Sequence, residues 1–243
     1  MSGHSKWSTI KRKKGANDAQ RAKIFTKIAR EIIVAVKAGG PDPDNNSSLK
    51  DAIAKARSNN MPNDNINRTI KKAAGDTDTD NYESITYEGY GPAGVAVIVN
   101  TLTDNRNRTA ADIRHAFDKN GGNMGQTGCV SFMFDRKGVI IIENDEIDED
   151  EITMAALEAG ADDIEVSEEV IEITTEPEVM GSVRDALSEN YTISSAEVSM
   201  VPQTMTELTD ESQITAMTKL LDMLEDNDDV QDVYHNWDMP DED

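Results

Sequence analysis

The sequence predicts an α+β protein with three domains: an N-terminal three-helix domain, a middle α/β domain completed by the C-terminal segment, and an inserted ferredoxin-like βαββαβ domain. Two observations predict this. Three apolar stripes with helical spacing lie within residues 18–75, and beyond an acidic, turn-rich stretch at residues 76–82 the pattern changes to short strands and helices. The expected domains are residues 1–75, residues 82–136 together with 204–243, and residues 137–203.

The N-terminal helices are defined by their caps and their apolar stripes. The first is expected to begin at a cap, Asn17 or Asp18, and to end at Gly39–Gly40; the second begins at the caps Ser47–Ser48 and the third at Asn63. The inward residues are Phe25, Ile28, Ala29, Ile32, Ile33 and Val36, then Leu49, Ala52, Ile53 and Ala56, then Ile66 and Ile70. The outward residues of the second and third helices include Lys50, Lys55, Arg57, Arg68, Lys71 and Lys72. We therefore expect a small helical domain with a positive surface.

The middle domain is expected to begin as a hairpin. Strands are expected at residues 84–90 and 95–102, on either side of a GPAG turn, and again at residues 128–134. An amphipathic helix is expected between them, at residues 109–120.

The inserted domain follows from the order of the next elements. From Gly138 to about residue 201 we expect strand, helix, strand, strand, helix, strand, which is the order of a ferredoxin-like sandwich. A helix near 210–225 and a strand at 230–236 follow, with no sheet of their own. We expect these two to return to the sheet of residues 82–134, which makes the ferredoxin-like unit an insertion.

Charge divides the chain into two parts. The formal net charge is −23, but residues 1–75 hold 16 Lys and Arg against six Asp and Glu, so this part carries +10 and the remaining 168 residues carry −33. A short, contiguous basic segment beside an acidic body indicates nucleic-acid binding by the N-terminal part; the alternative is an ordinary solvated helical face.

The basic arm at residues 1–16 carries the strongest functional signal. A segment rich in Lys and Arg with one aromatic residue can pair with phosphates and stack on an exposed base. About four to six phosphate contacts would give a log–log salt slope of about −4 to −5 on duplex DNA. No helix-turn-helix recognition element is evident, so base-specific reading is not implied. The candidate nucleic-acid-binding residues are Lys6, Trp7, Lys11, Arg12, Lys13, Lys14, Arg21, Lys23 and Lys27.

Two features of the acidic body are candidate anion sites. Arg106 and Arg108 before the expected helix, with Arg114 inside it, form either a second anion-binding patch or internal pairs with carboxylates. The segment GGNMGQTG, Gly121–Gly128, can cradle an anion with backbone amides, but it lacks the Lys-Ser/Thr of a P-loop and follows a helix. A tight connection with glycine at positive φ explains it better.

No metal ion, cofactor or catalytic site is expected. The three histidines show no zinc-ligand spacing to one another or to Cys129, which we interpret as a small buried hydrophobe. The acidic residues at 76–87 lack the glycine and the glutamate of a calcium loop, and the acidic run at 144–151 fits an exposed helix start. No nucleophile, acid or base can be assembled, which argues against an enzyme acting at the glycine-rich loop.

The chain is expected to work in the cytoplasm, with a monomer favoured. Its single cysteine fits a reducing compartment, no apolar run approaches the length of a membrane helix, and the N-terminus has no secretory pattern.

An ordered set of motifs runs from about Ser2 to Asn236 and is highly specific. The motifs are GHSKW, KIFTKIAREI, AGGPDP, ARSNNMP, YEGYGP, TDNRNRT, RHAF, GGNMGQTGCV, AALEAGA, AEVSM and VQDVYHN. Together they resemble the YebC family. The resemblance implies the same three-domain layout, no catalytic residues, and a role in the cytoplasm as a DNA-binding transcriptional regulator. Other members, which include mitochondrial translational activators, act in translation on the ribosome and ease synthesis of proline-rich stretches. Cys129 departs from the serine common at that position.

The expected function is therefore regulation of gene expression through nucleic-acid binding by the basic arm and helices, as a DNA-binding transcriptional regulatory protein. Two alternatives stay open: a ribosome-associated translation factor that binds rRNA, and a protein-interaction adaptor whose acidic domains bind a basic partner.

Overall fold

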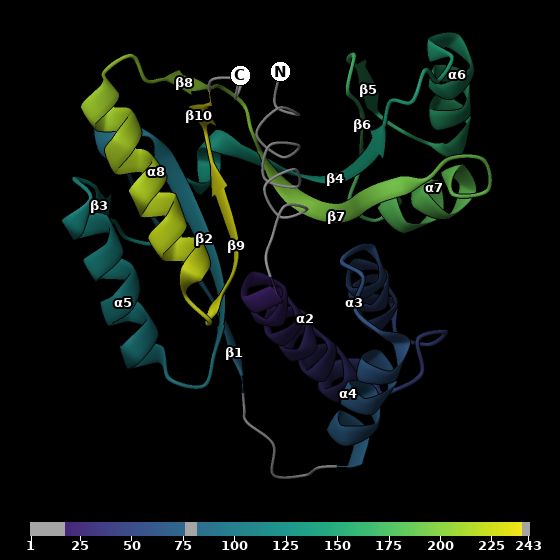
Figure 1. Ribbon diagram of the computed structural model, residues 1–243, viewed down its shortest axis with the longest axis horizontal. Helices are drawn as coiled ribbons and strands as arrows, with labels where there is room; N and C mark the ends of the chain where they lie inside the picture. Colours follow the sequence, from purple (N-terminus) through teal and green to yellow (C-terminus); the bar gives the residue numbers. More distant parts are fainter. Residues whose placement is uncertain (1–17, 76–81, 240–243) are drawn as a thin grey trace.

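A computed structural model describes residues 18–75 and 82–239 of the chain (Figure 1). It is an α+β protein that begins with three helices and continues with two four-stranded sheets, as the sequence predicts. Within the described residues, no helix combines the length and the apolar character needed to cross a membrane.

The N-terminal domain consists of α2 (Asp18–Gly39), α3 (Ser47–Ser58) and α4 (Asn63–Gly75). The predicted stripes meet in one core that includes Ile28, Ile32, Leu49 and Ile66. Gly40, just beyond α2, has a φ of +87°, which is the left-handed conformation expected of a glycine there.

The predicted cap of α3 is wrong by one residue. Asn46, and not Ser47–Ser48, caps the helix: its buried side chain accepts a hydrogen bond from the backbone N–H of Leu49 at 3.0 Å. Its amide nitrogen also donates to the carbonyls of Ala35 and Gly40, both at 2.8 Å. The Asn46 side chain accepts one hydrogen bond and donates two, and so satisfies backbone groups at two helix ends; a serine hydroxyl, with its single proton, could donate only one.

The middle sheet has the strand order β3-β1-β2-β9, and its neighbours are antiparallel. The predicted return of the C-terminal strand is seen directly, because β9 pairs with β2. Figure 1 shows α5 and α8 on the same side of this sheet, and their buried residues share a core with Val97 and Val99 of β2. The elements are β1 (Glu83–Tyr90), η1 (Pro92–Gly94), β2 (Ala96–Thr103), α5 (Arg106–Lys119), β3 (Asn123–Met124), η2 (Ser131–Met133), α8 (Glu211–Asp226), β9 (Val230–His235), and the parallel pair β8 (Thr206–Glu207) and β10 (Trp237–Asp238).

The second sheet has the strand order β5-β6-β4-β7 with antiparallel neighbours, the arrangement of a ferredoxin-like βαββαβ unit. Its elements are β4 (Phe134–Glu143), α6 (Glu149–Ala159), β5 (Asp163–Val166), β6 (Val170–Thr175), α7 (Met180–Leu187) and β7 (Ile193–Pro202). Phe134, at the start of β4, packs with Ala96 and Ile98 of the middle domain. The predicted boundary between residues 136 and 137 thus falls inside a continuous strand, and the domain boundaries stay a prediction.

Two element boundaries differ from the sequence prediction. α5 begins at Arg106, three residues early, because the side chain of Asn105 accepts a hydrogen bond from the N–H of Arg108 at 3.1 Å and caps the helix there. The strand predicted at residues 128–134 is wrong. Gly128 to Val130 form a turn, residues 131–133 form η2, and only Phe134 belongs to a strand.

Candidate nucleic-acid interface

Six of the nine predicted nucleic-acid-binding residues lie outside the described residues: Lys6, Trp7, Lys11, Arg12, Lys13 and Lys14. The other three, Arg21, Lys23 and Lys27, lie on α2 within two turns. The described residues therefore show the partners of the basic side chains on α2, α3 and α4, and of the predicted patch on α5.

The cations of α2 contact the acidic C-terminal end of α8. Lys23 forms an ion pair with Asp226, and the Nζ of Lys27 donates to the carbonyl of Glu225 at 2.6 Å. The hydrogen bond to Asp226, the largest cause, raises the pKa of Lys23 above its usual value. These two candidate residues thus hold the helical domain against the C-terminal segment in this conformation.

Arg30, one turn further along α2, makes the most extensive of these contacts. Its guanidinium donates to the carboxylate of Asp229 at 2.9 Å and to the carbonyls of Asp228 at 2.7 Å and Leu102 at 3.3 Å. It also lies 5.2 Å from the ring centroid of Tyr82. Arg30 contributes to the +10 charge of residues 1–75 but was not among the predicted binding residues.

Asp229 joins this contact to the predicted second anion patch. Only 3% of the residue is exposed, and its other carboxylate oxygen accepts from Arg108 at 2.7 Å and from the hydroxyl of Thr109 at 2.7 Å. Burial alone would raise the pKa of Asp229, but the hydrogen bonds from Arg108, Thr109 and Arg30 outweigh it and hold the pKa below its usual value.

Arg108 is therefore internally paired, which was one of the two interpretations left open. It also donates to Asp104 at 2.8 Å, and these hydrogen bonds to Asp229 and Asp104 raise the pKa of its guanidinium. Arg106 and Arg114 are exposed and form no ion pair with any described carboxylate. Of the three cations in the predicted patch, Arg106 and Arg114 therefore face solvent, whereas Arg108 links α5 to Asp229, just before β9.

Lys55 on α3 lies where the three domains meet. Its ammonium is 2.7 Å from the carboxylate of Glu31 on α2, 3.5 Å from that of Asp232 on β9, and 4.0 Å from that of Glu197 on β7. Its side chain is 22% exposed. Burial would lower the pKa of Lys55, but the charges of Asp232 and Glu31 outweigh that effect and raise it.

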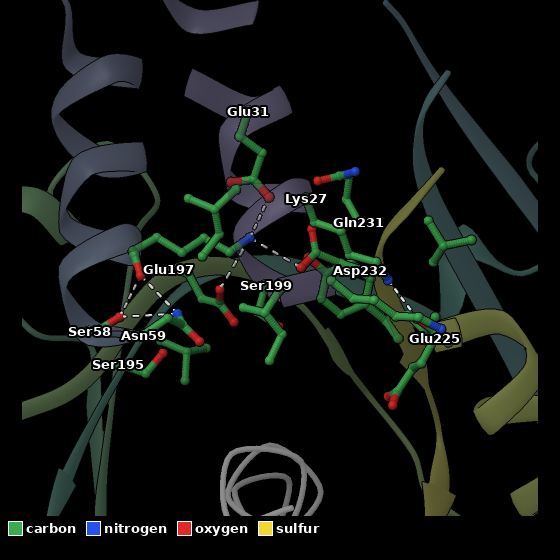
Figure 2. Close-up of a pocket in the computed structure, with 18 of the residues that line it drawn as sticks. Lys27, Glu31, Ser58, Asn59, Ser195, Glu197, Ser199, Glu225, Gln231 and Asp232 are labelled. Atoms are coloured by element: carbon green, nitrogen blue, oxygen red, sulfur yellow. Dashed lines mark hydrogen bonds and ion pairs between the residues drawn. The ribbon is translucent and has the colours of Figure 1, made fainter. Parts of the chain in front are cut away.

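These contacts border a cavity of about 1000 Å³ between the helical domain, β7 and β9. Figure 2 shows Lys27, Glu31, Glu197 and Asp232 around it, with hydrogen bonds and ion pairs crossing between the elements. Among the described lining residues, carboxylates outnumber lysine and arginine, seven to four, and the four cations include the predicted binding residues Arg21, Lys23 and Lys27. The described lining is therefore net acidic, which disfavours a polyanion in this conformation.

The contact between the helical domain and the ferredoxin-like domain uses the same chemistry. Lys50 on α3 pairs with Asp185 on α7 at 2.7 Å. In the reverse sense, Arg184 on α7 donates to Asp51 on α3 at 3.1 Å and to Asp185 at 2.8 Å. Ion pairs between α3 and α7 thus help to hold the helical domain against the ferredoxin-like domain.

An anion of the protein itself is held at the end of the glycine-rich segment, by Gly128 and by two residues that follow the segment. The buried carboxylate of Glu88 accepts hydrogen bonds from the backbone N–H groups of Gly128 at 2.8 Å, Val130 at 2.9 Å and Ser131 at 2.9 Å. These N–H groups are the ones a strand partner would need, which is why no strand forms at residues 128–133. Gly121 and Gly128 have φ angles of +76° and +88°, as a tight connection requires.

Cys129 lies in this turn and not in a strand. It is partly exposed and packs against the cluster that contains Ala96, Ile98 and Val130. Burial, with a smaller contribution from the charge of Glu88, raises the pKa of its thiol above the usual value. Among the residues that the structure describes, no three His, Cys, Asp or Glu side chains are grouped as metal ligands would be.

Replacing Glu88 with glutamine is expected to lower the free energy of unfolding by about 2 kcal/mol, because the amide NH₂ would face backbone donors and leave N–H groups unsatisfied. Burial raises the pKa of Glu88, but the hydrogen bonds from Val130, Gly128 and Ser131 outweigh it and lower the pKa. Urea denaturation measures the effect. Glu83→Gln, at an exposed position of the same strand, is the control and should change stability by less than about 0.5 kcal/mol. Equal losses in both variants would contradict the cradle.

Comparison with known proteins agrees with this architecture over nearly the whole chain. Residues 5–76 match a family model described as the TACO1/YebC protein N-terminal domain, and residues 82–237 match one described as the TACO1/YebC second and third domain. The chain belongs to the TACO1/YebC family. This is a non-enzymatic family, in agreement with the absence of a catalytic arrangement expected from the sequence.

Two bacterial relatives in the TACO1/YebC family are each named a probable transcriptional regulatory protein. The one from Acetivibrio thermocellus is 62% identical over 239 residues, covering 98% of this chain and 99% of the relative. The one from Ruminiclostridium cellulolyticum is 60% identical over 244 residues, covering 100% and 98%. The crystal structure of a conserved hypothetical protein from Aquifex aeolicus matches the fold with a TM-score of 0.83 at 46% identity, covering 93% of each chain.

Proposed function

We propose that this protein is a nucleic-acid-binding regulator of gene expression that acts in the cytoplasm as a DNA-binding transcriptional regulatory protein. The observation that carries the proposal is the charge of the chain, +10 in residues 1–75 and −33 in the rest. Phosphate is attracted to the first part and repelled by the second, so the protein binds nucleic acid with its N-terminal end. The names of the two relatives support the regulatory role.

The proposed contacts are the arm residues Lys6, Trp7, Lys11, Arg12, Lys13 and Lys14, and Arg21 at the start of α2. Lys23 and Lys27 contact phosphates only when they leave the end of α8, because Asp226 and the carbonyl of Glu225 bind them in the conformation seen here. The arm is therefore the primary contact, and the two lysines of α2 add to it when the helical domain moves.

Replacement of Lys11, Arg12, Lys13 and Lys14 by alanine is expected to reduce the salt dependence of binding. If about half of these side chains contact phosphates, the log–log slope on duplex DNA falls by about 2 units from about −4 to −5 in the unmodified protein. Fluorescence anisotropy with a labelled duplex, titrated between 50 and 300 mM KCl, measures it. The charge-conserving variant, with Lys and Arg exchanged at the four positions, should keep the slope.

The same proteins distinguish the target. Salt-sensitive sedimentation with ribosomal particles that survives DNase and is lost with RNase would assign the contact to rRNA and translation. A protein that binds neither duplex DNA nor structured RNA in a salt-dependent way would overturn the proposal in favour of a protein-interaction adaptor.

A further inference from the structure

Four cations of the helical domain are left uncovered by the acidic body. Arg57 at the end of α3 and Arg68, Lys71 and Lys72 on α4 are all exposed. No described carboxylate forms an ion pair with any of them, and Arg68 donates only to the side chain of Asn65, at 2.8 Å. The paired cations of the same domain, such as Lys23, Arg30, Lys50 and Lys55, all face the other two domains.

On this basis we infer that α4 forms a second phosphate-binding face, which contacts the backbone of a double-stranded nucleic acid. We call Arg68, Lys71 and Lys72 the α4 face. The inference rests on the proposed function and deepens it, because it assigns a binding surface within the folded domain, in addition to the arm.

The helical spacing places three of these cations together. Arg68, Lys71 and Lys72 are separated by three and four residues, so they lie on one side of α4. The opposite side is apolar: Ile66 and Ala73 are buried in the core of the helical domain. The α4 face is therefore presented outward by a helix whose other side is fixed.

The stability of the helix does not explain this arrangement. Like charges three and four residues apart cost about 0.2–0.5 kcal/mol per pair, and Arg68 faces both Lys71 and Lys72 in this way. The helix dipole favours cations in the last turn, which applies to Lys72 but not to Arg68 in the second turn. Asp64 lies one turn before Arg68 but forms no ion pair with it, so bound phosphates would supply the direct compensation that the three cations lack.

The residues around the α4 face favour backbone recognition over base recognition. Neutral amides flank the cations, since Asn60, Asn63 and Asn67 are exposed, and such side chains commonly donate to phosphate and sugar oxygens. Neither α3 nor α4 contains an aromatic residue on which a single-stranded base could stack. The face therefore fits a duplex, in which phosphates are regularly spaced and bases are already stacked.

The test uses the full chain with Arg68, Lys71 and Lys72 replaced by glutamine. Loss of about three phosphate contacts is expected to reduce the log–log salt slope on duplex by about 2–3 units and to weaken binding at least tenfold at 100 mM KCl. The exchange variant Arg68→Lys, Lys71→Arg, Lys72→Arg should keep both. Lys119→Gln with Lys219→Gln, two exposed lysines of the acidic body, should also leave the slope unchanged.

The outcomes separate this inference from the proposed function. If the unmodified protein binds duplex with an arm-dependent slope and the glutamine variant has the same slope, the α4 face is wrong and the proposed function stands. If the unmodified protein binds no nucleic acid, the proposed function itself fails. Parallel titrations of duplex DNA and an RNA hairpin identify the bound nucleic acid. A contact to the phosphate backbone predicts that the glutamine variant binds both more weakly. Weaker binding of only one of them would identify that duplex as the ligand of the α4 face. An unchanged melting temperature shows that the fold is intact.

Discussion

Replacing Asp229 with alanine is expected to lower the free energy of unfolding by about 3 kcal/mol. Removal of one partner from a buried ionic cluster typically costs about 3–5 kcal/mol, because the opposite charge is left without compensation. The lower end applies, since Arg30 keeps the carbonyls of Asp228 and Leu102, and Arg108 keeps Asp104. The same change also weakens the contact between the helical and middle domains. Urea denaturation measures the first effect, and the radius of gyration from small-angle scattering measures the second.

The variant Asp229→Asn is the matched control, because it keeps hydrogen-bonding atoms and removes the charge. Its loss should be smaller, about 1–2 kcal/mol. The pKa of Asp229 is lowered in the folded protein, so its contribution to stability is present above the unfolded value of about 3.9 and is lost as pH falls through the folded value. This part of the acid dependence should be missing in the asparagine variant. A loss below about 0.5 kcal/mol in the alanine variant would show that the cluster does not hold the domains.

The sequence predicts elements well where the signal is local. The apolar stripe of α2 and the glycine pair that ends it are defined by residues within one or two turns, and the structure places them as expected. The cap of α3 and the turn at Gly128 were wrong because distant groups decide them. Asn46 satisfies the end of α2 as well as the start of α3, and Glu88 comes from a strand forty residues away.

The internal pairing of the basic residues could not be predicted from sequence, for the same reason. Charge counts identified the basic end of the chain, but they do not say which cations find a partner. Lys23 and Arg30 pair with residues about two hundred positions later, and that proximity exists only because β9 returns to β2. The cations of α4 have the same residue types and lie on an amphipathic helix as well. Only their position in the fold shows that they are unpaired with the acidic body, whereas Lys23 and Arg30 are paired with it.

The acidic body therefore does more than repel phosphate. It covers the side of the helical domain that carries Lys23, Arg30 and Lys55, and leaves the other side exposed. Under the proposed function, a polyanion that approaches the helical domain therefore contacts the exposed cations of the α4 face and not the paired cations on the covered side. Higher salt weakens these exposed contacts more than the partly buried pairs, since screening acts most on charges in solvent.

Replacing Lys55 with methionine is expected to destabilise the protein by about 3 kcal/mol at pH 7. Methionine keeps the apolar stem, but the carboxylates of Glu31, Glu197 and Asp232 then lose the ammonium that lies among them. The mutual repulsion of the ionised carboxylates destabilises the folded variant, and it is removed as acid neutralises them. The difference between the variant and the unmodified protein should shrink as pH falls from 7 to 5.

Urea denaturation at several pH values between 5 and 8 measures this dependence. The control is Lys50→Met: its ion pair with Asp185 joins the same domain to α7, but the two side chains are 54% and 49% exposed. An exposed pair contributes at most about 1 kcal/mol, so this variant should lose little and show no such pH dependence. If the loss in Lys55→Met were the same at pH 5 and pH 8, packing of the side chain, and not its charge, would be what stabilises the junction of the three domains.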